Sequence, residues 1–138
     1  MSGGPARVTI RGLVEFTDTD ASGHYQNLAV LRWIEAAEAV LHQRLGIAHR
    51  TFGASPRVRL EIDFRRPVWF LDEVDIDLRV ERVGRTSCTY EFAVRCGDEL
   101  AAEGRSVVVH VPKVREKPVP WPEDLRVLLS EGGDRTAG

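Results

Sequence analysis

One long apolar segment constrains the fold of this chain more than any other feature. Residues 28–45 contain no proline, and apolar side chains recur there every three or four residues, which predicts an α-helix. Gly46 follows as a stop signal. The segment has only a narrow polar stripe, formed by Arg32, Glu35, Glu38 and His42. We therefore expect nearly all of the helix to be buried, and a sheet must bury it because the rest of the chain is rich in strand patterns.

Five strands are predicted around this helix. Alternating polar and apolar residues indicate strands over residues 7–16, 57–65, 74–83, 86–96 and 100–111. The last three are joined by short turns at Gly84-Arg85 and Gly97-Asp98, which predicts an antiparallel meander. The expected fold class is α+β, a five-stranded antiparallel sheet wrapped around one long central helix. One helix leaves the edge and the other face of the sheet uncovered, so we expect a homodimer or a homotetramer.

The length of 138 residues predicts a single domain, 1–138. A short amphipathic helix over residues 123–129 is expected to close it, with about 1–6 and 131–138 as disordered tails. Cys88 and Cys96 lie eight residues apart on one face of a predicted strand, too far apart to bridge each other. We expect both cysteines to be small buried apolar residues.

The charge balance limits the partners of the chain. Its 19 basic and 21 acidic residues give a net charge of −2, which argues against a nucleic acid or an anionic membrane as partner. No stretch has the apolar length of a signal peptide or a membrane span, so a cytoplasmic location is expected.

The turn before the predicted helix, residues 16–27, holds the strongest candidates for chemistry. Asp18 and Asp20 are common turn residues whose carboxylates bond nearby backbone amides. In the alternative interpretation, one carboxylate lies beside the positive end of the helix, where backbone N–H groups stabilise an oxyanion, and an ester or thioester is hydrolysed. His24 is either a base or an ordinary turn histidine. The three side chains are an incomplete ligand set, so no metal is expected.

Other polar residues favour structural roles. Arg32 and Glu35 are three residues apart on the predicted helix, where an ion pair between them is expected. Arg82 and Arg85 flank a tight turn, either as ordinary surface residues or as a phosphate site. The sequence has neither the Gly-x-Ser-x-Gly motif of a serine hydrolase nor a glycine-rich phosphate loop.

Residues 15–27 read Glu-Phe-Thr-Asp-Thr-Asp-Ala-Ser-Gly-His-Tyr-Gln-Asn, and residues 31–35 read Leu-Arg-Trp-Ile-Glu. This turn and the helix that follows resemble the signature of the 4-hydroxybenzoyl-CoA thioesterase-like branch of the hot-dog-fold acyl-CoA thioesterases. The order of strands, Phe-Arg-Arg-Pro-x-Trp at 64–69 and Asp-x-Val at 72–74 extend the resemblance over nearly the whole domain. The resemblance implies a hot-dog fold and a thioester hydrolase.

The resemblance also implies roles for individual residues. Asp20 falls on the catalytic carboxylate of the family, and the amide near Asn27 falls where the thioester carbonyl is polarised. The family's CoA-contacting arginines are best matched by Arg85, followed by Arg82. The remaining candidates in the turn are His24 as a catalytic residue and Gly23 and Tyr25 as substrate-binding residues.

We therefore expect hydrolysis of an acyl thioester presented by coenzyme A or an acyl-carrier protein. Asp20 acts as nucleophile or general base, and the helix N-terminus near Asn27 binds the oxyanion. No cofactor is expected, because coenzyme A is part of the substrate. Two alternatives stay open: a hydratase or dehydratase of acyl thioesters, and a non-catalytic acyl-CoA-binding module. The sequence leaves the acyl group undetermined.

Overall fold

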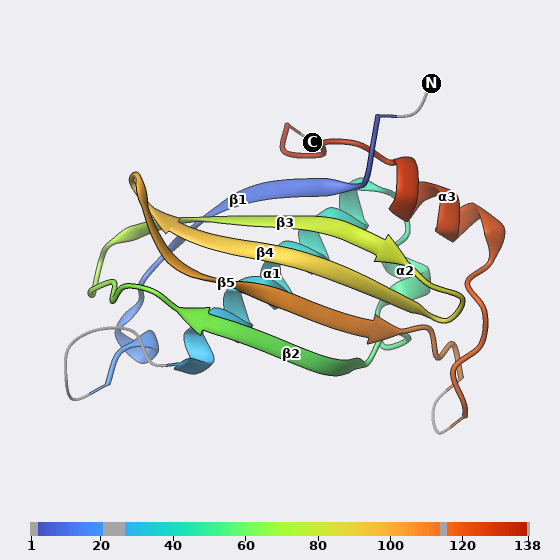
Figure 1. Cartoon of the computed structure of the whole chain (residues 1–138), viewed down its shortest axis with the longest axis horizontal. Coiled ribbons are helices and arrows are strands. Elements are labelled where there is room, and N and C mark those ends of the chain that lie inside the picture. Colours follow the sequence, from blue (N-terminus) through green and yellow to red (C-terminus); the bar gives the residue numbers. More distant parts are fainter. Residues whose placement is uncertain (1–2, 21–26, 114–115, 138) are drawn as a thin grey trace.

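A five-stranded antiparallel sheet packs against one side of a long helix (Figure 1). The computed structural model describes residues 3–20, 27–113 and 116–137. The strands are β1 (Arg7–Leu13), β2 (Arg57–Phe64), β3 (Glu73–Val83), β4 (Ser87–Cys96) and β5 (Glu99–Val109). The helices are the 3₁₀ turn η1 (Phe16–Asp18), α1 (Asn27–Arg44), α2 (Ala48–Thr51) and α3 (Glu123–Glu131). The predicted sheet around one long helix is therefore confirmed.

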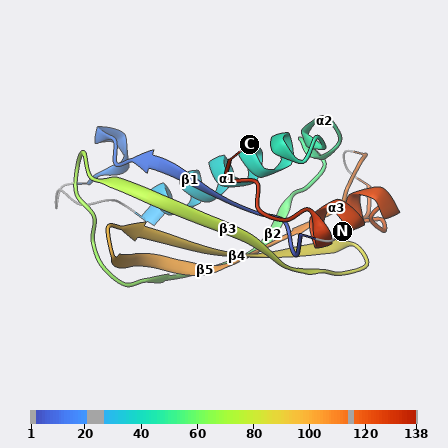
Figure 2. The same cartoon turned by 90° about the horizontal axis from the view of Figure 1, so that it is seen from above.

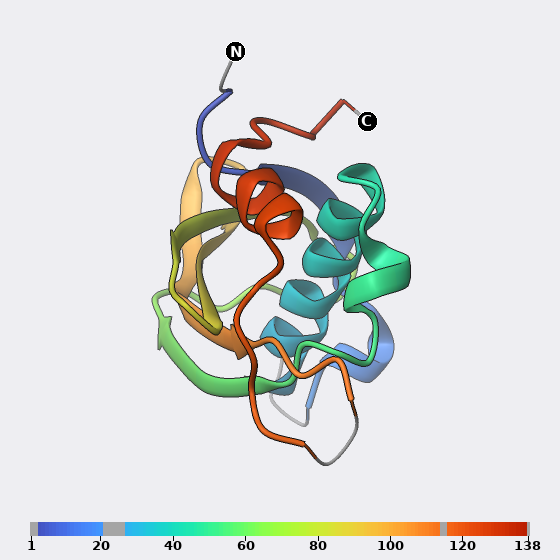
Figure 3. The same cartoon turned by 90° about the vertical axis from the view of Figure 1, so that its right-hand side faces the viewer.

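The strand order is β1-β3-β4-β5-β2, and every neighbouring pair is antiparallel. β3, β4 and β5 form the predicted meander, whereas β2 lies beside β5 at the far edge. The sheet is curved, and α1 lies along its concave side (Figure 2, Figure 3). β1 and β2 are thus the two edges of the sheet. Within the described part of the chain, no strand pairs along the outer side of β2, whereas Arg7 of β1 forms an isolated parallel bridge with Asp134.

The core forms where the inward side chains of the sheet meet α1. Alternation along β3 and β4 directs one side chain in two inward. The buried residues of the two strands are Val74, Ile76, Leu78, Val80, Cys88, Tyr90, Phe92 and Val94. Those of α1 include Val30, Trp33, Ile34, Ala37 and Leu41. Burial of each large apolar side chain contributes about 1.5–3 kcal/mol, which holds this face of α1 on the sheet.

The opposite side of α1 stays open, so the expectation that nearly all of the helix is buried is wrong. Leu28 is 70% exposed, and Ala36 and Ala39 are exposed as well. The reason is geometric, because the sheet curves around only one side of the helix (Figure 3). Small and apolar side chains therefore line an uncovered strip of α1.

The outer face of the sheet carries charged side chains. Cross-strand ion pairs there include Arg79–Glu91 at 3.1 Å and Arg105–Glu81 at 2.8 Å, and these side chains are partly exposed. An antiparallel sheet with such a face is stable against water. The outer face therefore does not need a covering partner. The surfaces that a second copy is expected to cover are the edge of the sheet and the open side of α1.

The two ends of the chain are placed against each other. Ala6 is fully buried, and the backbone N–H of Arg7 donates to Gly133 O at 2.9 Å. Arg135 N–H donates to Arg7 O at 2.7 Å, and Arg44 at the end of α1 donates to Arg135 O at 2.8 Å. Residues 3–6 and 131–137 therefore differ from the disordered tails that the sequence suggested. The hydrogen bond between Arg7 and Asp134 joins residues 127 positions apart, and composition alone does not predict such a long-range contact.

The two cysteines differ in their surroundings. Both are free, and Cys88 is buried as expected. Cys96, the last residue of β4, is only partly buried and packs against the edge of the core. None of the helices in the described ranges is long and apolar enough to cross a membrane.

Gly104 of β5 permits the close approach of β2. A Cβ atom at this position lies 1.8 Å from Glu61 O and 2.9 Å from Phe92 Cζ. Gly104→Ala must therefore displace β2, and we expect it to lower the free energy of unfolding by about 2–3 kcal/mol. Gly12→Ala is the matched control, because its Cβ meets side-chain atoms alone, the nearest being the end of Ile76 at 3.1 Å. Urea denaturation measures both losses, and equal losses contradict this explanation.

Candidate active site

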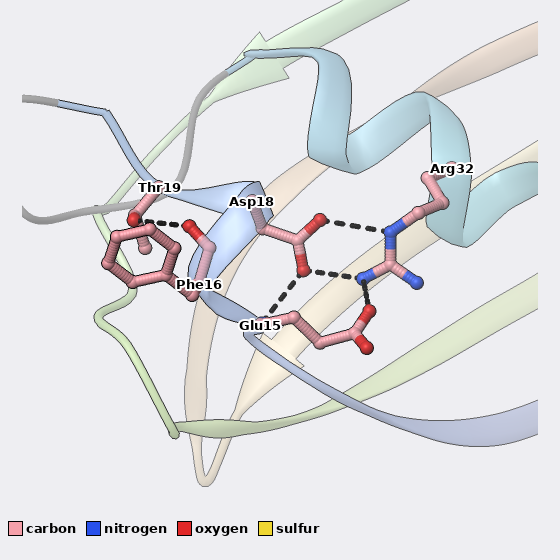
Figure 4. Close-up of polar contacts among 5 residues, drawn as sticks. All are labelled: Glu15, Phe16, Asp18, Thr19 and Arg32. Atoms are coloured by element: carbon pink, nitrogen blue, oxygen red, sulfur yellow. Dashed lines mark hydrogen bonds and ion pairs between the residues drawn. The ribbon is translucent and has the colours of Figure 1, made fainter.

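A buried carboxylate organises the turn that precedes α1 (Figure 4). Asp18, the last residue of η1, is only 4% exposed. Its Oδ2 accepts a hydrogen bond from the backbone N–H of Glu15 at 2.9 Å, and Asp18 N–H donates to Glu15 O at 2.9 Å. Thr19 donates its hydroxyl to Phe16 O at 2.7 Å. The turn is therefore fixed by its own short-range hydrogen bonds.

Arg32 joins this turn to α1 (Figure 4). Its Nε donates to Asp18 Oδ1 at 2.9 Å and its Nη2 to Asp18 Oδ2 at 2.5 Å, and Nη2 also lies 3.1 Å from Glu15 Oε2. The hydrogen bond to Asp18 raises the pKa of Arg32. We call this bidentate pair the Asp18–Arg32 clamp. The sequence suggested Glu35 as the partner of Arg32, but a buried carboxylate that fits the planar guanidinium is the stronger one.

Asp20 follows the clamp by two residues and is exposed. Arg32 lies in the second turn of α1, so the clamp ties the Asp20 turn to the beginning of that helix. A helix N-terminus presents unpaired backbone N–H groups and the positive end of the helix dipole. A carboxylate and an anion-stabilising helix end therefore lie at the same end of the molecule.

Several predicted site residues lie outside the described part of the chain. Gly23, His24 and Tyr25 belong to the segment between Asp20 and α1 that is not described. Asn27 is the first residue of α1, one residue before the predicted start, but its side chain is not described either. Their expected roles stay predictions.

Arg82 and Arg85 lie at the opposite end of the sheet from Asp20. β3 starts beside the end of β1, next to the Asp20 turn, and its last residues include Arg82, with Arg85 in the turn that follows (Figure 1). Both side chains are exposed. α3 holds this turn, because Arg126 Nη2 donates to Gly84 O at 2.8 Å. A single chain therefore does not bring the two arginines to Asp20.

A second set of polar groups lies in a groove between α1, α2 and the start of β2. The groove has a volume of about 770 Å³. Its apolar lining includes Leu31, Ala39, Phe52, Val58 and Leu60. Its polar lining includes Glu35, Glu38, His42, Ser55 and Arg57. We call this feature the α1–β2 groove.

Glu38 and Arg57 form a largely buried ion pair in the α1–β2 groove. Arg57 Nη1 lies 2.8 Å from Glu38 Oε1 and donates to Ser106 Oγ at 2.9 Å. The side chains of Arg57 and Glu38 are 18% and 15% exposed, respectively. Burial raises the pKa of Glu38 from 4.5 to about 7, although the charge of Arg57 opposes this shift. Glu38 therefore retains its proton to a higher pH than an exposed glutamate.

His42, one helical turn after Glu38, is fully engaged in hydrogen bonds. Its Nδ1 lies 2.7 Å from Thr51 Oγ1, and its Nε2 lies 2.6 Å from the Tyr90 hydroxyl. Thr51 Oγ1 also donates to Ile47 O at 3.3 Å, so we assign the Tyr90 hydroxyl as donor to Nε2 and Nδ1–H as donor to Thr51. Burial lowers the pKa of His42 from 6.5 to about 4. His42 is therefore neutral at pH 7.

The sequence identified Glu38 and His42 only as members of a polar stripe. Their spacing of four residues shows that they share a helix face, and Tyr90 falls on an inward position of its strand. Neither pattern shows that this face of α1 meets α2 and β2. Sequence reasoning therefore missed the groove. The only signal for it in the sequence was the presence of polar residues on an otherwise apolar helix.

Known proteins with related sequences share this architecture. Residues 14–129 match the family described as the thioesterase-like superfamily. The chain belongs to this superfamily. A 1,4-dihydroxy-2-naphthoyl-CoA hydrolase of Prochlorococcus marinus (strain MIT 9303) is 31% identical to it over 105 residues, which are 67% of this chain and 70% of the relative. A hydrolase of the same name from Synechococcus elongatus is 25% identical and covers 88% of this chain and 94% of its own.

Solved structures of thioesterases have the same fold. A thioesterase of Thermus thermophilus, solved with coenzyme A and Zn, is 33% identical, covers 94% of both chains and has a TM-score of 0.80. A predicted thioesterase of Bacillus stearothermophilus is 28% identical, covers 90% of this chain and 94% of its own, and has a TM-score of 0.81. The predicted hot-dog fold and the prediction of a thioesterase are confirmed. In the described ranges of this superfamily member, no three His, Cys, Asp or Glu residues are grouped to hold a metal ion.

The Asp18–Arg32 clamp should stabilise the thioesterase more than the neighbouring surface pair does. In a double-mutant cycle, we expect a coupling of about 1–2 kcal/mol between Asp18→Ala and Arg32→Ala, because Asp18 is buried. The matched cycle uses Glu15→Ala and Arg32→Ala, and should give less than about 0.5 kcal/mol because both side chains are about half exposed. Chemical denaturation measures both values. Equal couplings contradict a special role for the buried carboxylate.

Glu38 should make the stability of the thioesterase depend on pH. Its folded pKa lies above its ordinary value, so the folded state binds more protons than the unfolded state between pH 4.5 and about 7. This contribution lowers the stability as the pH rises through that window. His42 has the opposite effect between about pH 4 and 6.5, because its folded pKa is lowered. The two contributions oppose each other in the wild type.

Glu38→Gln isolates the contribution of Glu38. The free energy of unfolding of the variant, minus that of the wild type, should increase by about 3 kcal/mol between pH 4.5 and 7. Denaturant titrations at a series of pH values measure this difference. Glu99→Gln, at an exposed position, is the control and should leave the difference from the wild type independent of pH. A constant difference for Glu38→Gln contradicts the raised pKa.

Proposed function

We propose that the chain hydrolyses an acyl-CoA thioester with the Asp20 carboxylate as the reacting group and the N-terminus of α1 as the oxyanion site. The observation that carries the proposal is the Asp18–Arg32 clamp, which ties the Asp20 turn to the beginning of α1. Asp18 itself is buried and bound by three donors, so it serves as support. Asp20 is exposed to an approaching substrate.

Two routes from this arrangement are chemically complete. In the first, an Asp20 oxygen forms a bond to the thioester carbon, the carbon–sulfur bond breaks, and the CoA thiolate leaves and takes a proton from water. Water then hydrolyses the resulting anhydride. In the second, Asp20 removes a proton from a water molecule, the hydroxide adds to the carbonyl, and the thiolate leaves and takes the proton back from Asp20. In both routes the carbonyl oxygen becomes an oxyanion that backbone N–H groups stabilise.

The substrate is proposed from the relatives and from chemistry. The Prochlorococcus and Synechococcus relatives are named for 1,4-dihydroxy-2-naphthoyl-CoA, so an aromatic acyl-CoA is the first substrate to test. The Thermus structure was solved with coenzyme A, which favours CoA over a carrier protein as the group that presents the acyl chain. Arg85, with Arg82, is proposed to meet the phosphates of CoA.

The complete site is proposed to form between two copies of the chain. Asp20 and Arg85 lie at opposite ends of one chain, and the outer edge of β2 is unpaired in the described structure (Figure 1). Two copies joined by antiparallel β2 strands would place the start of one β2 beside the end of the other. Exposed apolar side chains at both ends of β2 support such an interface: Phe52 and Val58 near its start, and Phe64, Trp69 and Phe70 near its end. The cytoplasmic location stays a prediction.

Asp20→Asn should abolish most hydrolysis while the oligomer remains folded. We expect kcat/KM for 1,4-dihydroxy-2-naphthoyl-CoA to fall by about a thousandfold, because the amide is neither a base nor a comparable nucleophile. Release of free thiol measures the rate, and size-exclusion chromatography reports the assembly. Asp98→Asn, at the exposed β4–β5 turn, is the control and should keep the wild-type rate. Full activity of Asp20→Asn contradicts the assignment. Formation of an enoyl thioester from a 3-hydroxyacyl-CoA, without free thiol, favours a dehydratase.

A single turnover in heavy-oxygen water separates the two routes. Attack by Asp20 introduces label into its own carboxylate when the anhydride is hydrolysed at the enzyme carbonyl. General-base catalysis places the label in the released acid alone. Mass spectrometry of the peptide that contains Asp20 measures the difference.

A further inference from the structure

The turn between β3 and β4 carries Arg85, with Arg82 at the end of β3, and is bound by α3 and the segment before it (Figure 1). We infer that Arg126 of α3 is a positioning residue, which fixes the backbone of this turn so that its arginines meet the phosphates of CoA. The inference rests on the proposed function, because it concerns the nucleotide part of the same substrate. It adds a residue that contacts the turn and not the substrate.

The guanidinium group of Arg126 binds three consecutive carbonyl groups of the turn. Its Nη2 donates to Gly84 O at 2.8 Å and to Arg85 O at 3.4 Å. Its Nη1 donates to Val83 O at 3.4 Å. A planar guanidinium offers several N–H donors in a fixed arrangement, so one side chain can fix several acceptors at once. Arg126 therefore restrains the backbone on both sides of Gly84.

Two further residues bind the other carbonyl groups of the turn. Trp121 N–H donates to Arg85 O at 3.0 Å, and its indole Nε1–H donates to Ser87 O at 2.9 Å. His110 N–H donates to Thr86 O at 2.8 Å, and the His110 ring stacks on Trp121 with the centroids 4.7 Å apart. All five carbonyl oxygens from residue 83 to residue 87 thus accept hydrogen bonds. Their partial negative charge is directed at donors of the protein and not at an approaching anion.

The turn gathers positive charge that the described part of the chain does not neutralise. Within that part, no carboxylate forms an ion pair with Arg82, Arg85 or Arg126, whereas arginines on the outer face of β3 and β5 pair with glutamates at 3.1 and 2.8 Å. The backbone N–H groups of Arg85 and Thr86 donate to no described residue either. Unpaired guanidinium and backbone N–H groups are the donors that bind phosphate. The turn therefore fits an anion of the phosphate class.

Arg126 is the contact that can be removed while the core stays filled. Trp121 is only 5% exposed, so its loss would leave a cavity. Arg126 is partly exposed, and α3 is anchored independently by the fully buried side chains of Leu125 and Leu129. Loss of Arg126 should therefore leave α3 in place but free the backbone of the turn. The Arg85 guanidinium then samples more positions, and binding of a phosphate must again restrict it, which lowers affinity.

A pair of substrates with and without the nucleotide tests the inference. The ratio of kcat/KM for 1,4-dihydroxy-2-naphthoyl-CoA to that for the pantetheine thioester of the same acid is measured for the wild type and for Arg126→Ala. We expect this ratio to fall by about tenfold, the size of one hydrogen bond to a charged group. The change should lie in KM for the CoA thioester, with kcat unchanged. Arg50→Ala is the matched control, because it removes the ion pair of α3 with Asp124 but no contact to the turn, and should keep the wild-type ratio.

A double-mutant cycle separates positioning from direct contact with the substrate. Arg82→Ala combined with Arg85→Ala should itself lower the ratio, and the addition of Arg126→Ala should lower it no further, because Arg126 acts through these two residues. Independent losses that multiply overturn the inference, since Arg126 then acts without the turn. An unchanged ratio in Arg126→Ala also overturns it. If Arg126→Ala does not fold, Arg126→Gln replaces it, and the same outcomes decide.

Binding measurements keep the test independent of turnover. Calorimetry compares the dissociation constants of coenzyme A and of pantetheine for the wild type and for Arg126→Ala. Binding of coenzyme A should weaken by about tenfold while that of pantetheine stays unchanged, and equal changes for both ligands, or none, overturn the inference. Absence of thioester hydrolysis by the wild type overturns the proposed reaction alone, because the dissociation constants still decide the role of Arg126.

Discussion

The packing of one face of α1 on the concave side of the sheet is the constraint on which the rest of the structure depends. That face is apolar, so burying it leaves the polar positions of α1 along the boundary between the sheet and the open side. Arg32, Glu38 and His42 all lie on this boundary and reach different elements: η1, β2 and α2. One helix therefore fixes the reacting turn at its start and forms a wall of the groove farther along.

The two buried carboxylates along this boundary differ in how completely they are paired. Asp18 accepts hydrogen bonds from a backbone N–H and from two guanidinium nitrogens, which satisfies it and makes it a rigid support. Glu38 pairs with Arg57 and accepts from the Ser106 hydroxyl, yet burial still raises its pKa to about 7. Asp18 therefore acts as a support, whereas Glu38 makes the stability of the fold depend on pH.

Sequence reasoning succeeded where one element determines its own structure. Alternation placed β3 and β4 within one residue of their observed starts, and helical spacing predicted residues 28–45 for a helix that spans Asn27–Arg44. It failed where distant segments meet. The hydrogen bond between His42 and Tyr90 joins residues 48 positions apart, and the open side of α1 depends on how far the sheet curves. The turn chemistry of Asp18 predicted its supporting role. Its partner Arg32 was instead paired with Glu35, because spacing along the helix shows which residues share a face but does not show that a distant carboxylate binds more strongly.

The arrangement of groups along the chain separates binding from chemistry. The α1–β2 groove and the turn that carries Arg82 and Arg85 lie toward one end of the molecule, whereas Asp20 and the start of α1 lie at the other (Figure 1). A thioester of CoA has the same division, with a neutral acyl group and an anionic nucleotide on either side of the reacting carbonyl. In the proposed pair of copies, one chain would hold the nucleotide while the other presents Asp20 to the carbonyl. Substitutions that release the turn of Arg82 and Arg85 would then weaken the binding of CoA without altering the clamp that positions the reacting carboxylate.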